Sequence, residues 1–268
     1  MATNLDLHPA LVDEAVAVGG RRTKKEGPPF QRRNRPSIRL TLGTLVTTAA
    51  VAACVVMLVG QGRHPVSGRQ IAQVMGHEGA AWLERPERVA EEAPAKAIKA
   101  LTIRPGQAVA DIGAGSGYYS VLLADAVGPA GRVYATDIQP EMLALIKQKI
   151  DARAVRNIEP VLGTAVATGL PDGAIDMALM VDVYHELEQP QVFLRSLKRA
   201  LKPEGRLVLI EFRKEDPRVP IREEHKMSVR EARMELEAEG FRLERVSDVL
   251  PWQHILVFTA KGTATFSR

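Results

Sequence analysis

The sequence predicts an α/β fold in which a mostly parallel β-sheet is covered by helices on both faces. From residue 96 onward, short apolar runs alternate with helical patterns, as in sheets built from strand–helix–strand units. A glycine-rich turn follows the first apolar run, and the last two runs lie too close together for a helix between them. These observations place one folded domain at residues 96–262, with an N-terminal membrane-spanning helix ahead of it.

The expected elements follow one another in a regular order. Seven apolar runs predict strands at residues 108–111, 132–137, 158–161, 175–181, 206–212, 241–246 and 254–260. Helical patterns lie near residues 118–127, 140–153, 190–201 and 228–239. The last two strands are joined only by SDVLPWQ, so we expect them to pair antiparallel.

Residues 40–60 form an apolar stretch without a single charged side chain. A helix of this length would measure about 31 Å, close to the hydrocarbon thickness of a bilayer. The stretch therefore predicts a transmembrane segment, with a cleaved export signal as the alternative. A buried core helix is less expected, because soluble helices of this length usually carry a polar face.

The basic excess of the chain is confined to its N-terminal tail. Residues 1–39 hold eight basic and four acidic side chains, which leaves 28 of each over residues 40–268. The tail is also rich in glycine and proline, and this composition predicts that it is disordered. A neutral domain is not expected to bind nucleic acid. Because basic flanks stay on the cytoplasmic side, the charge rule places the domain in the periplasm, with a cytoplasm-facing domain as the alternative.

Residues 111–120, DIGAGSGYYS, place three alternating glycines between a strand and a helix. Glycine lets the backbone approach a ligand closely, and the helix start offers free N–H groups. The dinucleotide fingerprint requires a glycine where Tyr118 stands, and no Gly-Lys-Ser/Thr of a P-loop follows. The turn predicts a nucleotide-like ligand of another kind.

The stretch ADIGAGSGYYS resembles the first motif of the class I S-adenosylmethionine-dependent methyltransferases, and VYATDIQPEML resembles the second. The resemblance covers residues 96–260 and implies a Rossmann-like, doubly wound, seven-stranded sheet whose last strand is antiparallel. Two further stretches, HPVSGRQIAQVMG and HKMSVREARMELEAEGF, resemble a bacterial subgroup of this family that often carries export signals. The implied cofactor is S-adenosylmethionine.

The resemblance also implies the cofactor-binding residues. Asp111 would hold the amino end of the methionine, Asp137 the ribose hydroxyls, and Ile138 would pack on the adenine. Thr164 stands where many relatives carry an aspartate, so its contact with the adenine amino group is a departure from the family pattern. The full implied set is Asp111, Gly113, Ala114, Gly115, Gly117, Tyr118, Asp137, Ile138, Thr164 and Asp182.

Candidate catalytic residues follow the predicted fourth strand. His185 lies at the carboxyl edge of the sheet, where ligands bind in this architecture, and histidine is the usual proton acceptor. Asp182 would orient His185 or line the cofactor pocket, and Tyr119 is the third candidate. Glu211 is a weaker candidate, with a surface ion pair as the alternative. His225 and Lys226 are expected in an exposed loop, with a place in the acceptor pocket as the alternative. The sequence shows no cluster typical of a metal site.

The predicted function is methyl transfer to a small-molecule or lipid-like acceptor. Residues 61–95 are interpreted as a linker and a possible flap over the cofactor. An NAD(P)-dependent oxidoreductase on the same sheet and a non-catalytic cofactor-binding module at the membrane are the alternatives.

Overall fold

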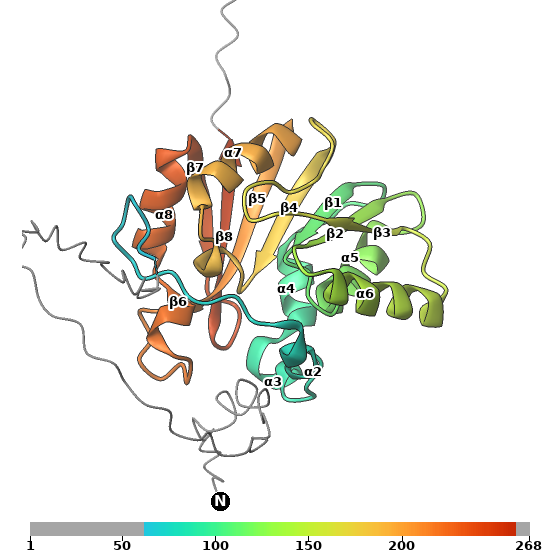
Figure 1. The fold of residues 1–268 in the computed structure, drawn as a ribbon, viewed down its shortest axis with the longest axis horizontal. Coiled ribbons are helices and arrows are strands. Elements are labelled where there is room, and N and C mark those ends of the chain that lie inside the picture. Colours follow the sequence, from blue (N-terminus) through green and yellow to red (C-terminus); the bar gives the residue numbers. More distant parts are fainter. Residues whose placement is uncertain (1–61, 261–268) are drawn as a thin grey trace, which may run out of the picture. The chain divides into compact units, whose positions relative to one another are not determined.

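The computed structural model describes residues 62–260 (Figure 1). The strands are β1 (Ala108–Ile112), β2 (Arg132–Asp137), β3 (Ile158–Leu162), β4 (Ile175–Val181), β5 (Leu201–Arg213), β6 (Lys226–Met227), β7 (Phe241–Ser247) and β8 (Gln253–Ala260). The α-helices are α2 (Ala80–Leu83), α3 (Arg88–Glu92), α4 (Pro94–Ala100), α5 (Tyr118–Val127), α6 (Pro140–Arg153), α7 (Pro190–Ala200) and α8 (Val229–Ala238). Short 3-10 turns are η2 (His77–Gly79), η3 (Tyr184–Glu186) and η4 (Glu223–His225).

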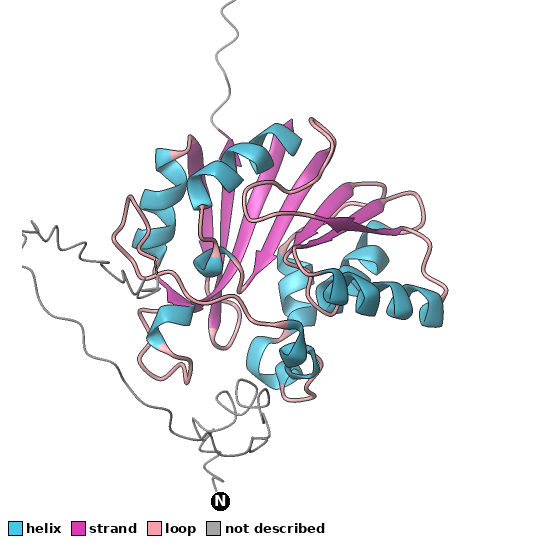
Figure 2. Cartoon of the chain, in the orientation of Figure 1, coloured by secondary structure: helices cyan, strands magenta, loops and turns pink. Residues whose placement is uncertain are grey.

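The strands form one twisted sheet in the order β3-β2-β1-β4-β5-β8-β7 (Figure 2). β8 runs antiparallel to both of its neighbours, and the other pairs are parallel. The mostly parallel sheet with an antiparallel strand near its end is thus confirmed. The strand order reverses between β1 and β4, which makes their carboxyl ends the ligand-binding edge of this architecture.

The two faces of the sheet carry separate apolar cores. Alternation along β5 sends Val208 and Ile210 to one core and Leu207 and Leu209 to the other. Helices α4, α5 and α6 cover the first face, whereas α7 and α8 cover the second (Figure 1). The doubly wound arrangement follows from strands that are apolar on both sides.

Two strand predictions need correction. β6 was not predicted: it has only two residues, which pair with Phe212 and Arg213 of β5, and so short a run carries no periodicity. β5 begins at Leu201 instead of residue 206, because Leu201 pairs with Ile175 ahead of an irregularity in the β4–β5 register.

Residues 62–76, ahead of the first helical turn, pack against the domain, and we call this segment the strap. Arg69 forms a buried ion pair with Glu235 of α8, with 3.0 Å between Nε and Oε1, and Ser67 also hydrogen-bonds to Glu235. Farther along, the backbone N–H of Ala72 donates to the carbonyl oxygen of His185. The strap therefore reaches from α8 to the carboxyl end of β4.

None of the helices within residues 62–260 is both long and apolar enough to cross a bilayer. The predicted membrane segment, residues 40–60, lies outside the described residues, as does the predicted disordered tail.

Candidate active site

The glycine turn lies at the switch point between β1 and β4. Gly113, Gly115 and Gly117 have φ angles of 66°, 53° and 77°, the left-handed region that side chains disfavour. Space is also restricted: a Cβ on Gly113 would lie 2.7 Å from Val183, and one on Gly115 would lie 2.6 Å from Leu83. These positions require glycine for both conformation and close approach. Ala114, between them, is buried, and its N–H donates to the carbonyl of Thr136.

Asp137 ends β2 and ties two loops together. Its Oδ2 accepts a hydrogen bond from the N–H of Gly115 and its Oδ1 accepts one from the N–H of Gln139, both at 2.9 Å. Burial raises the pKa of Asp137, while these backbone donors act in the opposite direction. Each oxygen keeps a further lone pair, so the carboxylate both shapes the glycine turn and remains able to accept from a ligand.

Asp111, at the end of β1, is buried under the same turn. Its Oδ2 accepts a 2.6 Å hydrogen bond from the Ser120 hydroxyl. Burial raises the pKa of Asp111 to about 6; the hydrogen bond from Ser120 and the nearby cation Arg88 lower it, but by less than burial raises it.

The two predicted adenine-side residues lie near the surface. Ile138, immediately after Asp137, is an apolar residue that is 44% exposed. The Thr164 hydroxyl accepts hydrogen bonds from the N–H groups of Val166 and Ala167, so its oxygen is engaged in a local turn. Its O–H remains a possible donor to a ligand.

Helices α2 and α3 lie against the glycine turn. Besides the Leu83 contact, the Ser116 hydroxyl donates to Glu84. Farther along, the guanidinium of Arg88 lies 4.5 Å from the ring centre of Tyr118 and 5.2 Å from that of Tyr119. Arg88 is itself buried and paired with Glu92 at 2.6 Å.

Tyr119 and Asp182 each present a buried polar atom without a hydrogen-bond partner among the described residues. These atoms are the Tyr119 hydroxyl and Oδ1 of Asp182, and Oε1 of Gln253 shares the property. Asp182 also has a φ of 54°, rare for a residue other than glycine, and its Oδ2 accepts from Gln253 at 2.6 Å. Orphaned buried polar atoms and backbone strain mark functional sites, because a ligand can supply the missing partners.

His185 sits in η3, just past β4, and is fully enclosed. Its Nδ1 lies 2.6 Å from Oε2 of Glu211, and its Nε2 lies 3.1 Å from Nδ1 of His225. Burial lowers and Glu211 raises the pKa of His185, with a net increase. The pKa of His225 is lowered to about 4, mainly by burial and to a smaller extent by the neighbouring His185.

Three expectations about this cluster are corrected. Glu211 is fully buried instead of forming a surface ion pair, because β4 and β5 pair in a register that sets Glu211 beside the turn after β4. The N–H of Tyr184 donates to Oε1 of Glu211. His225 and Lys226 do not lie in an exposed loop. His225 is half-buried because η4 packs against η3, and Lys226 is buried because β6 joins the sheet. Asp182 contacts Gln253 and does not orient His185, whose Nδ1 is bound by Glu211.

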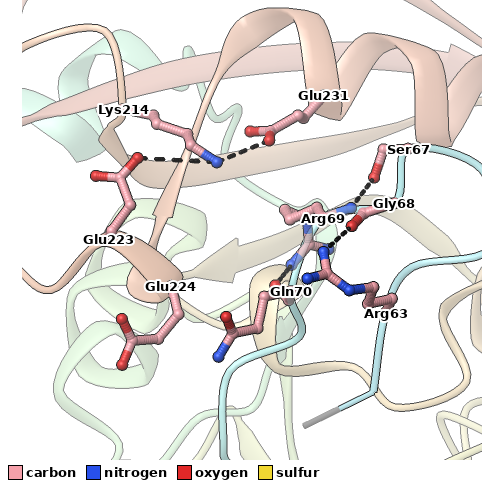
Figure 3. A pocket seen from close by; sticks show the side chains of 9 residues that line it. All are labelled: Arg63, Ser67, Gly68, Arg69, Gln70, Lys214, Glu223, Glu224 and Glu231. Carbon is pink, nitrogen blue, oxygen red and sulfur yellow. Dashed lines mark hydrogen bonds and ion pairs between the residues drawn. The ribbon is translucent and has the colours of Figure 1, made fainter.

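A separate cavity of about 370 Å³ lies between the strap and α8 (Figure 3). Its charged lining is largely paired internally: Lys214 lies 2.8 Å from Glu231, and Arg63 donates to the carbonyl of Gly68. None of the described residues that line this cavity has a buried side-chain polar atom without a partner, unlike Tyr119 and Asp182 near the glycine turn.

A doubly wound sheet with a glycine turn at its switch point, and an acid at the end of the next strand, defines an α/β protein that binds a nucleotide-type cofactor. A family model described as a methyltransferase domain matches residues 110–209. The structure is similar to that of a SAM dependent methyltransferase from Aquifex aeolicus, with 31% identity, a TM-score of 0.66, and coverage of 69% of this chain and 98% of that one. The chain therefore belongs to the S-adenosylmethionine-dependent methyltransferases, and its cofactor is S-adenosylmethionine.

Curated relatives match over a shorter region. A demethylmenaquinone methyltransferase of Geobacillus sp. (strain WCH70) is 28% identical over 114 residues, which is 42% of this chain and 49% of that protein. The ubiquinone/menaquinone biosynthesis C-methyltransferase UbiE of Enterobacter sp. (strain 638) is 34% identical over 113 residues, 42% of this chain and 45% of that protein. The chain thus spans about half the length of the curated relatives it matches.

The residues at the switch point fit this cofactor. Gly113 presents exposed backbone at the turn, whereas Gly115 lies under Leu83 in this structure. Asp137 keeps free lone pairs for hydroxyl donors, and Ile138 offers a partly exposed apolar surface. Asp111 supplies a buried acid for an ammonium group. Sequence reasoning missed that Asp137 also braces the turn through Gly115, an interaction without a local sequence signal.

Proposed function

We propose that this protein transfers the methyl group of S-adenosylmethionine to a small, apolar acceptor of the quinol or phenol type. The observation that carries the proposal is the pair of orphaned buried oxygens, Tyr119 Oη and Asp182 Oδ1, beside a glycine turn that fits the cofactor. An acceptor hydroxyl supplies what these two atoms lack. The names of the curated relatives, which are quinone methyltransferases, support the same acceptor class.

The chemistry depends mainly on positioning. The bound cofactor supplies a methyl group already activated on a sulfonium, so no protein nucleophile is needed. Asp137 and the turn from Gly113 to Gly117 hold the cofactor, while Tyr119 and Asp182 orient the acceptor so that its nucleophilic atom reaches about 3–3.5 Å from the methyl carbon. Helices α2 and α3 exclude water from the turn.

His185 is the candidate for managing the acceptor's proton. Glu211 binds Nδ1 and thereby directs Nε2 away from the sheet, toward His225. A proton accepted at Nε2 has a route outward through His225, which is only half-buried. His185 and Glu211 thus act as a proton-handling pair at the carboxyl ends of β4 and β5.

We place this activity at a membrane, because residues 40–60 would tether the domain where apolar acceptors dissolve. The charge rule puts the domain on the periplasmic side. The alternatives are a cleaved signal and a cytoplasm-facing domain.

Binding and transfer are tested separately on the full-length protein. Titration calorimetry should show S-adenosylmethionine binding that Asp137→Asn weakens by about 10- to 150-fold, since hydrogen bonds to charged groups contribute about 1.5–3 kcal/mol. Glu141→Gln, an exposed acid at the start of α6, is the matched control and should bind normally. Unchanged affinity in Asp137→Asn would overturn the assigned cofactor site.

Transfer is measured with methyl-labelled cofactor and a short-chain demethylated quinol. Label in the quinol fraction supports the proposed acceptor class. Binding without transfer to quinols, phenols or extracted membrane lipids would instead favour a non-catalytic cofactor-binding module.

A further inference from the structure

Three side chains with metal-ligating atoms converge between η3 and η4. Nε2 of His185 lies 3.1 Å from Nδ1 of His225 and 4.0 Å from Oε1 of Glu186. One ligand atom from each of the three lies within 4.8 Å of the others. His185 is buried and its two companions are half-buried, so the atoms face one another away from bulk water.

The hydrogen bond between His185 and Glu211 fixes which imidazole nitrogen carries the proton. Nδ1 donates to the Glu211 carboxylate across 2.6 Å, so Nε2 of the neutral ring carries a lone pair. That lone pair points at Nδ1 of His225. Two neighbouring imidazole nitrogens with a carboxylate beside them form an electron-rich pocket.

The geometry points to a divalent transition-metal ion, of which Zn²⁺ is the best match, bound by Nε2 of His185, Nδ1 of His225 and the carboxylate of Glu186. Metal–nitrogen distances of about 2.0–2.1 Å set two nitrogens on one tetrahedral ion about 3.4 Å apart, close to the observed 3.1 Å. Imidazole donors suit zinc and its neighbours, whereas Mg²⁺ and Ca²⁺ prefer oxygen. The ligands lie 40 residues apart in sequence, which is why no metal-site spacing was visible there.

The residues around these three ligands also include partners that orient the ligands, as metal sites require. A carboxylate bound to the far nitrogen of a ligating histidine orients the ring and raises its basicity, and Glu211 has this place. Glu211 is itself fixed by the N–H of Tyr184. The strap holds the same turn from the other side, because Arg69 and Ala72 both donate to the carbonyl oxygen of His185.

The cation would lie beside the cofactor cradle. Val183, two residues before His185, packs on Gly113 of the glycine turn. Three protein ligands leave one position open, as in catalytic zinc sites. If the proposed methyl transfer holds, the acceptor hydroxyl oxygen would enter that position, and the cation would lower the affinity of this oxygen for its proton. The proton would then pass to solvent water at the half-buried side of the site, since Nε2 of His185 is bound to the cation. This last step rests on the proposed function, whereas the cation site does not.

The site is tested by metal binding alone, without cofactor or acceptor. Full-length protein is stripped with a chelator, dialysed against Zn²⁺ and assayed for bound metal, and Co²⁺ is added in parallel for its visible absorption. The expected result is one tightly bound ion per chain and the intense spectrum of four- or five-coordinate Co²⁺. Glu211→Gln should weaken binding by about 10- to 100-fold, and His225→Ala and Glu186→Gln should weaken it more.

His77→Ala is the matched control, because His77 also pairs with a glutamate, Glu78, but on the surface. It should bind metal like the wild type. Binding that is absent, or that survives in His225→Ala, would overturn the site, as would an equal loss in His77→Ala. Thermal unfolding of each variant separates loss of a ligand from loss of the fold, and the wild-type Co²⁺ spectrum decides the question even if a variant is unstable. Because cofactor binding at Asp137 is measured independently, failure of this inference leaves the proposed function untouched.

Discussion

Asp111 combines a cost in stability with a proposed role at the cofactor. Burial raises its pKa from 3.8 to about 6, so the charged form is disfavoured in the folded state. For a carboxyl whose pKa is raised by folding, stability is highest at low pH and falls as pH rises between about 4 and 6. Above pH 6 the full cost, at most about 3 kcal/mol, is present.

Asp111→Asn should therefore stabilise the protein by about 1–3 kcal/mol at pH 7.5, and by progressively less toward pH 5. The amide keeps the hydrogen bond with Ser120, and it should bind S-adenosylmethionine more weakly. Urea unfolding at several pH values measures the first effect. Asp125→Asn, an exposed acid on α5, is the control. A stability gain independent of pH would contradict this account.

At the residue scale, the sequence predicted what local pattern encodes and missed what only the sheet register brings together. The positions of the glycines in the turn, and of Asp111 and Asp137 at the strand ends, could be predicted because strand ends and turns leave a local signature. Glu211 was undervalued, although an acid within the apolar run RLVLIEF, one strand from a histidine, was the available signal. His225 had none, because its contact with His185 depends on a loop 40 residues away.

The short helices α2 and α3 lie within residues 61–95, the segment interpreted from the sequence as a possible flap over the cofactor. Leu83 packs on Gly115 yet is only half-buried, so removing its side chain costs little folding energy. If these helices cover the cofactor, Leu83→Ala should speed cofactor dissociation several-fold and lower stability by about 1 kcal/mol. Stopped-flow displacement measures this rate. Val89→Ala, on the exposed side of α3, should leave the rate unchanged, and equal rates in both variants would contradict the flap.

The strap depends on one buried carboxylate. Glu235 of α8 accepts from Arg69 and Ser67, and Nε2 of His64 lies 3.3 Å from it. Breaking a buried ion pair from one side costs about 3–5 kcal/mol, because the remaining charge is left unpaired. Glu235→Gln should lower the free energy of unfolding by about 2–4 kcal/mol, since the amide keeps one acceptor.

Chemical denaturation measures the Glu235→Gln effect. Glu237→Gln, which removes the partly exposed i,i+4 partner of Arg233 on the same helix, is the control and should change stability by less than about 0.5 kcal/mol. A small loss in Glu235→Gln would mean that the strap is held mainly by apolar contacts. In that case the buried residues Ile71 and Ala72 are the ones to change next.

At the scale of the whole molecule, the sheet could be predicted because its central strands, β1, β4 and β5, are apolar on both sides and helical patterns follow β1, β2 and β4. The resulting two cores, one on each face, need no information beyond period and order. The strap could not be predicted, because HPVSGRQIAQVMG has no periodicity. It is held by a long-range ion pair between Arg69 and Glu235.

The orientation of the domain relative to a membrane is the prediction with the widest consequence. Eight basic side chains in residues 1–39 precede the apolar residues 40–60, and basic flanks are retained in the cytoplasm. A C-terminal alkaline phosphatase fusion should therefore be active and a C-terminal green fluorescent protein fusion dark. Replacing Arg32, Arg33, Arg35 and Arg39 with glutamine should weaken this bias. Because S-adenosylmethionine is made in the cytoplasm, an external domain must receive its cofactor across the membrane or bind it before export. A fluorescent fusion would contradict the charge rule here, and it would place the glycine turn directly in the cytoplasmic cofactor pool.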